Sequence, residues 1–161
     1  MRPLPSRTLI ALGVLLTLGA LNAAIVGKEQ IKRSGDVVYL ALEPVDPRSL
    51  MQGDYMALRF ALVRQIEERA DGVTREGMVG LAPVALDERR VARLLAPDAA
   101  AALTLRYRIR GGAVWLGTNA FFFEEGSAER FTDARYGEFR VDRASGEAVL
   151  VGLRNAQLEA M

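Results

Sequence analysis

A long run of uncharged, mostly apolar residues near the N-terminus constrains this chain more than any other feature. The run spans residues 8–26, and its only polar residues are Thr8, Thr17 and Asn22. As a helix it would be about 28 Å long, close to the hydrocarbon thickness of a bilayer, about 30 Å. A cleaved signal peptide usually has a shorter apolar region, and no clean small-x-small cleavage site follows this run. We therefore expect residues 8–26 to cross the lipid bilayer as an uncleaved anchor.

Positive charges flank this run on both sides. Arg2 and Arg7 favour a cytoplasmic N-terminus, whereas Lys28, Lys32 and Arg33 follow the other end of the run. A count of these charges alone would lean toward the opposite orientation. The charge pattern therefore does not decide the orientation by itself.

The composition excludes several kinds of functional site. The chain has no Cys and no His, so a thiolate nucleophile, a disulfide, a Cys/His zinc site and a Ser-His-Asp triad are all impossible. Its net charge of +1 gives no broad electrostatic case for nucleic acid binding. Catalysis, if present, would depend on carboxylates, tyrosine, arginine or a hard metal. We expect no cofactor, no resident metal and no nucleic acid partner.

The residues after the anchor have the alternating pattern of a β-rich domain. Strands are expected at residues 36–43, 55–66, 73–86, 103–110, 113–116, 138–141 and 147–153. Short helical turns are expected after Pro47 and at residues 91–95. We therefore predict a mainly β (α+β) fold, with one N-terminal transmembrane helix followed by an antiparallel β sandwich or a partly closed barrel with one or two short helices. Residues 1–33 would form the anchor and juxtamembrane helix, and residues 34–161 the domain.

The stretch before the second strand has the strongest local structural signals. Asp46 and Pro47 suit the N-cap and first residue of a helical turn, and Gly53 can end that turn in a left-handed conformation. Asp54 can close the turn through a nearby backbone N–H, with Tyr55 opening the next strand. These local roles explain the residues without any chemistry. The alternative is that Asp46, Asp54 and Tyr55 form a polar cluster for binding or catalysis.

Two motifs resemble the GDYXXLXY family of bacterial membrane-anchored proteins, whose activity is unassigned. Residues 53–60 read Gly-Asp-Tyr-Met-Ala-Leu-Arg-Phe, and residues 121–126 read Phe-Phe-Phe-Glu-Glu-Gly, similar to a second family landmark. The family pattern ends in Tyr where this chain has Phe60, so the aromatic bulk is kept and the hydroxyl is lost. The candidate interaction residues are Asp46, Pro47, Arg48, Gly53, Asp54, Tyr55, Leu58, Phe60, Glu125 and Gly126.

The resemblance implies a location and a kind of partner. It favours a single-pass protein of the bacterial inner membrane, with a cytoplasmic N-terminus and a periplasmic or otherwise extracytoplasmic domain. The resemblance also implies a partner, because relatives look to be encoded with, or fused to, multi-spanning membrane proteins. The main functional hypothesis is therefore a non-enzymatic accessory protein that binds a multi-spanning membrane protein.

A row of arginines on the strand at residues 103–110 supports a second hypothesis. Arg106, Arg108 and Arg110 alternate with apolar residues, so they should lie on one face of the sheet. Such a face could bind an acidic ligand or a lipid headgroup. The simpler interpretation is that the arginines pair with Glu or Asp across the sheet.

A third hypothesis rests on four carboxylates. Asp46, Asp54, Glu124 and Glu125 could form a carboxylate-based hydrolase site or a calcium site if the fold brings them together. The chain has no contiguous calcium-binding loop of the Asp/Asn/Gly type. We therefore rank this hypothesis last.

Overall fold

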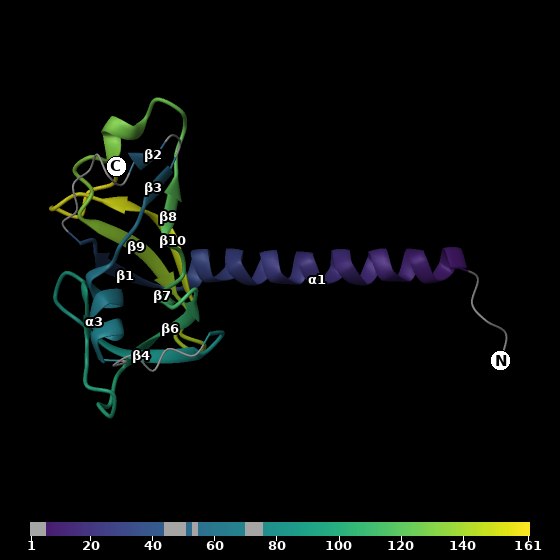
Figure 1. The fold of residues 1–161 in the computed structure, drawn as a ribbon, viewed down its shortest axis with the longest axis horizontal. Coiled ribbons are helices and arrows are strands. Elements are labelled where there is room, and N and C mark those ends of the chain that lie inside the picture. The colour runs from purple at the N-terminus through teal and green to yellow at the C-terminus, as the bar shows by residue number, and fades with distance from the viewer. Residues whose placement is uncertain (1–5, 44–50, 53–54, 70–75) are drawn as a thin grey trace.

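The computed structural model describes residues 6–43, 51–52, 55–69 and 76–161 (Figure 1). A long helix projects from one side of a β-rich domain, and the C-terminus lies within that domain. In chain order the elements are α1 (Ser6–Ser34), β1 (Asp36–Ala41), β2 (Met51–Gln52), β3 (Tyr55–Ala57), α3 (Ala61–Arg69), β4 (Val79–Leu86), β5 (Ala92–Leu94), β6 (Leu103–Arg110), β7 (Ala113–Trp115), β8 (Ala120–Phe122), the 3-10 helix η1 (Ala128–Phe131), β9 (Tyr136–Val141) and β10 (Ala148–Arg154).

The helix α1 exposes its apolar side chains along its whole length. Its span from Arg7 to Ser34 has a mean hydropathy of 2.4 over its most apolar window, and none of that window is buried in the domain. Leu15 and Leu16 are 67% and 66% exposed. Apolar surface of this extent is unfavourable in water. Its length and composition are compatible with a single-pass membrane anchor.

The strands form antiparallel sheets that curve into a half-barrel. The sheet orders are β1-β9-β10, β2-β3-β8 and β5-β4-β6-β7. The turn between β9 and β10 joins the first sheet to the third, because the N–H of Arg106 donates to the carbonyl of Gly146 at 2.7 Å. The predicted mainly β fold with a partly closed barrel is confirmed.

One apolar core lies inside the half-barrel. Alternate residues of β6 face it, with Leu105 and Ile109 only 0% and 1% exposed. Phe60 and Phe139 meet edge to face in this core, with ring centroids 5.3 Å apart. Gly137 makes this contact possible, because a Cβ there would lie 2.9 Å from the Phe60 ring.

The predicted strand at residues 55–66 is wrong beyond Ala57. The chain turns into α3 at Ala61, although Leu58 and Phe60 face the core as the alternating pattern predicts. Leu62 and Ile66 are spaced one helical turn apart, and both are buried on the inner face of α3. Leu62 and Ile66 fit the two-residue period of a strand and also the four-residue spacing of one helix face. The sequence pattern alone therefore does not distinguish a strand from a helix here.

The predicted helical turn at residues 91–95 is also wrong, because β5 occupies most of it. The Asp87 side chain accepts hydrogen bonds from the backbone N–H groups of Arg89 and Val91, both at 2.9 Å. Arg90 adopts a left-handed conformation with φ of 63°. This tight turn reverses the chain, and β5 then pairs with β4 instead of continuing as a helix.

Two phenylalanines test this description of the core. Phe60 is 2% exposed and Phe122 is 74% exposed. Phe60→Ala should lower the free energy of unfolding by about 3–5 kcal/mol, because it leaves a cavity in the core. Phe122→Ala should cost about 1 kcal/mol or less, mainly through loss of its contact with the Tyr55 ring. Urea denaturation of the full chain in mild detergent measures both changes, and similar losses for the two variants would contradict the described core.

Candidate functional site

The residues of the first motif that the structure describes are mainly core residues. Leu58 and Phe60 are 4% and 2% exposed, so their side chains pack inside the domain. Tyr55 is half-buried on β3, and its ring lies 5.7 Å from that of Phe122. The backbone N–H of Leu58 donates to the carbonyl of Asn119 at 2.7 Å, which joins this stretch to the start of the second motif. These positions give Leu58 and Phe60 a structural role.

The other proposed motif residues are not brought together in the described part of the chain. The residues Asp46, Pro47, Arg48, Gly53 and Asp54 lie outside the described residues. Glu125 and Gly126 form an exposed turn after β8, where Gly126 has φ of +78°. Among the described residues, no three Asp or Glu side chains lie close enough together to hold a metal ion.

A recess of about 540 Å³ lies beside the first motif, between α3 and β7. Phe60, Arg64 and Trp115 contribute to its lining. Glu67 fixes one wall, because its carboxylate accepts a hydrogen bond from the backbone N–H of Val114 at 2.9 Å. Two of the charged residues that line this recess, Glu43 and Arg64, pair with each other, so they are not available to a charged ligand without loss of that pair.

The strongest of these pairs centres on Arg64. Its guanidinium contacts Glu68 at 2.7 Å and Glu43 at 2.8 Å. The negative charge of Glu68 and the hydrogen bond to Glu43 raise the pKa of Arg64 above its ordinary value. The side chains of Arg64 and Glu68 are largely at the surface, so this cluster adds little to stability and mainly orients the side chains.

The arginine row on β6 has no acidic residues opposite it. Arg106 lies opposite Leu81, and Arg108 lies opposite Val79 and Trp115 on the neighbouring strands. Arg110 lies opposite Ala113. Within the described ranges, none of the three arginines forms an ion pair. The expected pairing of this row with Glu or Asp across the sheet is therefore wrong for the part of the chain that the structure describes.

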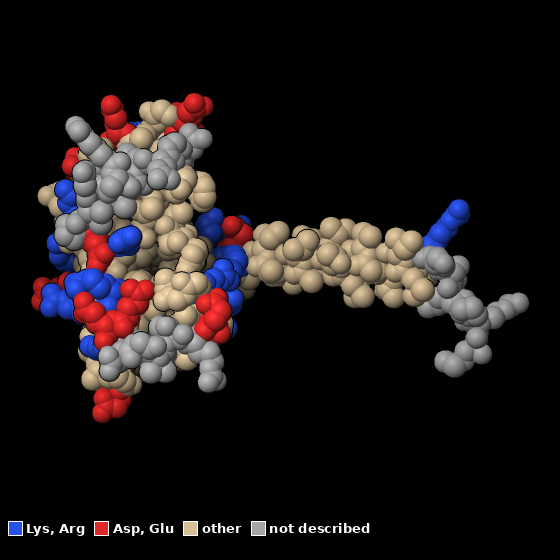
Figure 2. All heavy atoms as spheres, in the orientation of Figure 1, with Lys and Arg blue, Asp and Glu red and all other residues tan. Residues whose placement is uncertain are grey.

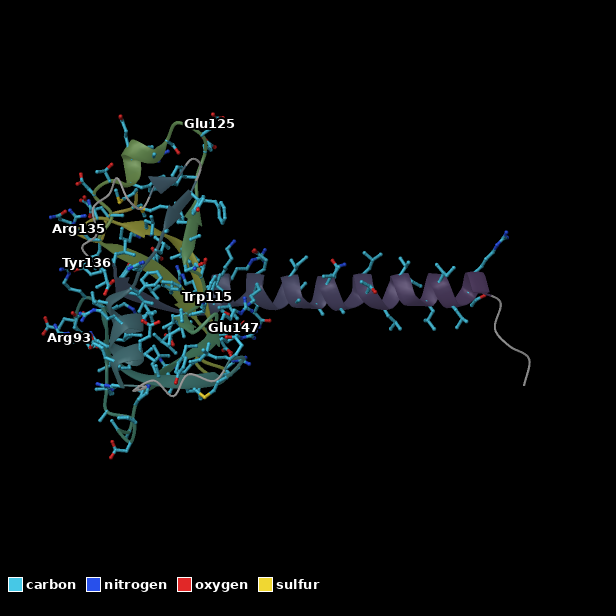
Figure 3. All side chains as sticks on the ribbon, in the orientation of Figure 1. Arg93, Trp115, Glu125, Arg135, Tyr136 and Glu147 are labelled. Carbon is cyan, nitrogen blue, oxygen red and sulfur yellow. The ribbon has the colours of Figure 1, made fainter. Side chains whose placement is uncertain are left out.

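These arginines line a second recess, of about 390 Å³, on the side of the domain from which α1 leaves. We call it the arginine recess, and its main side chains are those of Lys28, Arg106, Arg108, Arg110, Trp115 and Glu147. Trp115 and Glu147 both lie on this side in Figure 3, and Figure 2 shows basic side chains gathered at the base of the helix. The guanidinium of Arg110 lies 5.8 Å from the centre of the Trp115 ring, a cation–π contact.

Ion pairs lie at the junction between α1 and the domain, next to this recess. Lys28 pairs with Glu147 in the turn before β10. Asp36, at the start of β1, contacts Arg143 at 2.9 Å and Arg90 at 3.6 Å. The hydrogen bond to Asp36 raises the pKa of Arg143 above its ordinary value. The end of α1 is thus attached to the turn before β10, and the start of β1 to the turns that contain Arg143 and Arg90.

The sequence pattern did not predict one buried ion pair. Glu138, in the central strand β9, is 4% exposed and is the buried charged residue among those described. It pairs with Arg154 of β10, and Arg140 approaches its other oxygen at 3.8 Å. Glu138 and Arg154 are 16 positions apart, so only the register of β9 and β10 could reveal the pair. Both charges are satisfied within the domain, which indicates a structural role.

The comparisons with known proteins support the family resemblance. The family model described as GDYXXLXY protein matches residues 17–153. This range includes both motifs, the arginine recess and the C-terminal half of α1. No curated protein and no solved structure matches the chain. The match confirms the resemblance seen in residues 53–60 and 121–126.

The turn beside the arginine recess gives a testable pH dependence. Asp142 accepts hydrogen bonds from the Ser145 hydroxyl and from the backbone N–H groups of Ser145 and Ala144. The Ser145 hydroxyl, with the two backbone N–H groups, lowers the pKa of Asp142 below its ordinary value. Ser145→Ala should therefore raise the pKa of Asp142, which NMR titration of its carboxyl carbon would measure.

The sign of the stability effect follows from this shift. Because the pKa of Asp142 is lower in the folded state, its contribution is complete above the unfolded value, about 3.9, and is lost as the pH falls through the folded value. The stability difference between wild type and Ser145→Ala should therefore be largest near neutral pH and shrink in acid. An unchanged Asp142 pKa in the variant would contradict this geometry.

Proposed function

The chain belongs to the GDYXXLXY family, and we propose that it is a non-enzymatic accessory protein that binds a multi-spanning membrane protein. In this proposal α1 crosses the bacterial inner membrane once, with the N-terminus in the cytoplasm. The β domain then lies in the periplasm or another extracytoplasmic space. The absence of Cys and His supports the non-enzymatic part of the proposal, because it removes the commonest nucleophiles and general bases.

One observation supports this function most: α1 is exposed over its apolar length and yet firmly attached to the domain at its end. A simple tether needs no specific contacts with the domain it carries. Here the last turns of α1 contact β9 and β10, and Lys28 pairs with Glu147. A helix attached in this way fixes which face of the domain meets a neighbour in the membrane.

The surface of α1 offers places where another helix could approach closely. A Cβ added at Gly13, Gly19 or Gly27 would meet no atom of this chain within 4 Å. Ala20 and Ala24 lie near Gly13 and Gly27 on the same side of the helix. Membrane helices associate through such small residues because their backbones can come into van der Waals contact. The transmembrane helices of the partner would pack against this side.

Affinity purification from native membranes in mild detergent tests the proposal. The wild-type chain should retain a multi-spanning membrane protein in stoichiometric amount, and the tagged partner should retain the chain in return. In the key variant, a leucine-rich segment of equal length replaces residues 8–26, so the protein stays in the membrane but loses the specific surface of α1. The partner should be lost from this variant.

A finer variant and a control complete this test. Gly13→Leu combined with Ala20→Leu should weaken retention of the partner, because the larger side chains separate the helix backbones. Leu15→Ile combined with Leu18→Ile, on exposed apolar positions of the opposite side of the helix, serves as the control and should leave retention unchanged. Absence of any stoichiometric partner, or full retention by the leucine-rich anchor, would contradict the proposal.

A further inference from the structure

The arginine recess lies where α1 leaves the membrane. Lys28, which lines the recess, follows the apolar run by two positions, so it lies about 3 Å beyond the run along the helix axis. The headgroup layer on each side of a bilayer is roughly 5–7 Å thick. Lys28 therefore lies at headgroup depth once residues 8–26 occupy the hydrocarbon region. Trp115 and Glu147 lie on the side of the domain from which α1 leaves (Figure 3), which is the side nearest that layer when α1 crosses the membrane.

The charges in the recess are strongly unbalanced. Four cationic side chains and a single carboxylate line it, and that carboxylate, Glu147, is already paired with Lys28. The guanidinium groups of Arg106, Arg108 and Arg110 have no carboxylate partner among the described residues. By contrast, Arg64, Arg143 and Arg154 each contact an acidic side chain. Three guanidinium groups without a carboxylate partner among the described residues therefore line the same recess.

Apolar side chains surround these donors on the same face of the sheet. Directly opposed residues of antiparallel strands project to the same face, so Leu81 lies beside Arg106, and Val79 beside Arg108. Leu81 is 58% exposed and Val79 is 47% exposed. Trp115 adds an aromatic ring beside Arg110. Tryptophan and long basic side chains next to apolar surface are typical of proteins at the membrane–water interface.

From this combination of depth, charge and apolar surroundings, we infer that the arginine recess binds the phosphate group of an anionic phospholipid in the membrane that α1 crosses. Guanidinium groups match phosphate well, because their planar donors can form two parallel hydrogen bonds to its oxygens. Leu81, Val79 and Trp115 face the upper acyl region around the headgroup. The inference goes beyond the accessory role, since this binding needs only the protein and the lipid.

The single tryptophan provides a direct measurement. Trp115 is the chain's sole Trp and lies in the recess, so its fluorescence reports on binding there without labelling. The purified full chain in neutral detergent is titrated with phosphatidylglycerol, and in parallel with phosphatidylcholine. Phosphatidylglycerol should give a saturable change in Trp115 emission at lower lipid concentration than phosphatidylcholine, because only phosphatidylglycerol has a net negative headgroup.

Variants of the arginines identify the binding groups. Replacement of Arg106, Arg108 and Arg110 together by Gln should weaken phosphatidylglycerol binding by at least about tenfold, since charge-assisted hydrogen bonds are lost. Replacement of the same three by Lys keeps the charge and should give an intermediate affinity, because lysine lacks the planar pair of donors. Arg108→Gln alone, at an exposed position, should weaken binding less and keeps the test valid if the triple Gln variant does not fold.

A charge-matched control separates a specific recess from general attraction. Arg93, Arg130 and Arg135 lie outside the recess, and Arg93 and Arg135 lie on the side away from α1 in Figure 3. Their combined replacement by Gln removes the same charge and should leave phosphatidylglycerol binding unchanged. Equal loss in the control and recess variants would overturn the inference, because it would show attraction by net charge alone.

Two further results would also overturn it. One is equal binding of phosphatidylcholine and phosphatidylglycerol. The other is displacement of the lipid by soluble glycerol phosphate at a similar concentration, in excess of the displacement by sodium chloride at the same ionic strength. Such displacement would show that the recess binds free anions and is not a lipid site. The purified chain contains no partner, so these results are independent of the accessory role.

Discussion

The close junction between α1 and the first sheet determines how the rest of the structure is presented. A single residue, Gly35, separates α1 from β1, and its N–H donates to the carbonyl of Ile31 at 2.8 Å. A Cβ at this position would lie 2.6 Å from that carbonyl oxygen and 3.0 Å from the backbone nitrogen of Val141. Only glycine allows the helix end and β9 to approach this closely. The junction between α1 and the domain therefore has no flexible linker on which the domain could swing.

The distribution of carboxylates follows from this junction. Glu147 pairs with Lys28 of α1, Asp36 pairs with Arg143 at the start of β1, and Glu138 pairs with Arg154 inside the first sheet. No acidic residue lies opposite the arginines of β6, whose neighbours are apolar. Arg64, Arg143 and Arg154 thus pair with acidic side chains, whereas Arg106, Arg108 and Arg110 have no ion pair among the described residues. The proposed lipid phosphate would supply the missing negative charge beside Leu81 and Val79.

The sequence predicts the elements whose patterns are local. The strand at residues 103–110 is confirmed with the same bounds, because its apolar and polar residues alternate without interruption and Gly111 and Gly112 end it with positive φ. The apolar run of α1 is equally clear. The pattern at residues 55–66 is ambiguous, because the spacing of Leu62 and Ile66 suits a helix as well as a strand, and only packing against the domain decides. The division into residues 1–33 and 34–161 stays a prediction.

The candidate site was predictable only in part. The arginine row was predictable from the sequence of β6. The absence of acidic residues opposite it was not, because the register of β4 and β7 decides which residues lie opposite the arginines. Lys28 and Glu147 meet across 119 positions of sequence, and no local pattern indicates that α1 closes one side of the recess. The positions of Gly146 and Glu138 likewise depend on contacts between distant strands.

The orientation of the domain against the bilayer is the central claim, and the depth of two surface positions tests it most directly. The chain has no Cys, so Val79→Cys and Arg93→Cys each give one site for a spin label. With the full chain in bilayers that contain a nickel-chelating lipid, the nickel at the headgroups should strongly relax a label at position 79, opposite Arg108, and barely affect one at position 93. Equal relaxation at the two positions would show that no fixed face of the domain meets the membrane, and would contradict the account.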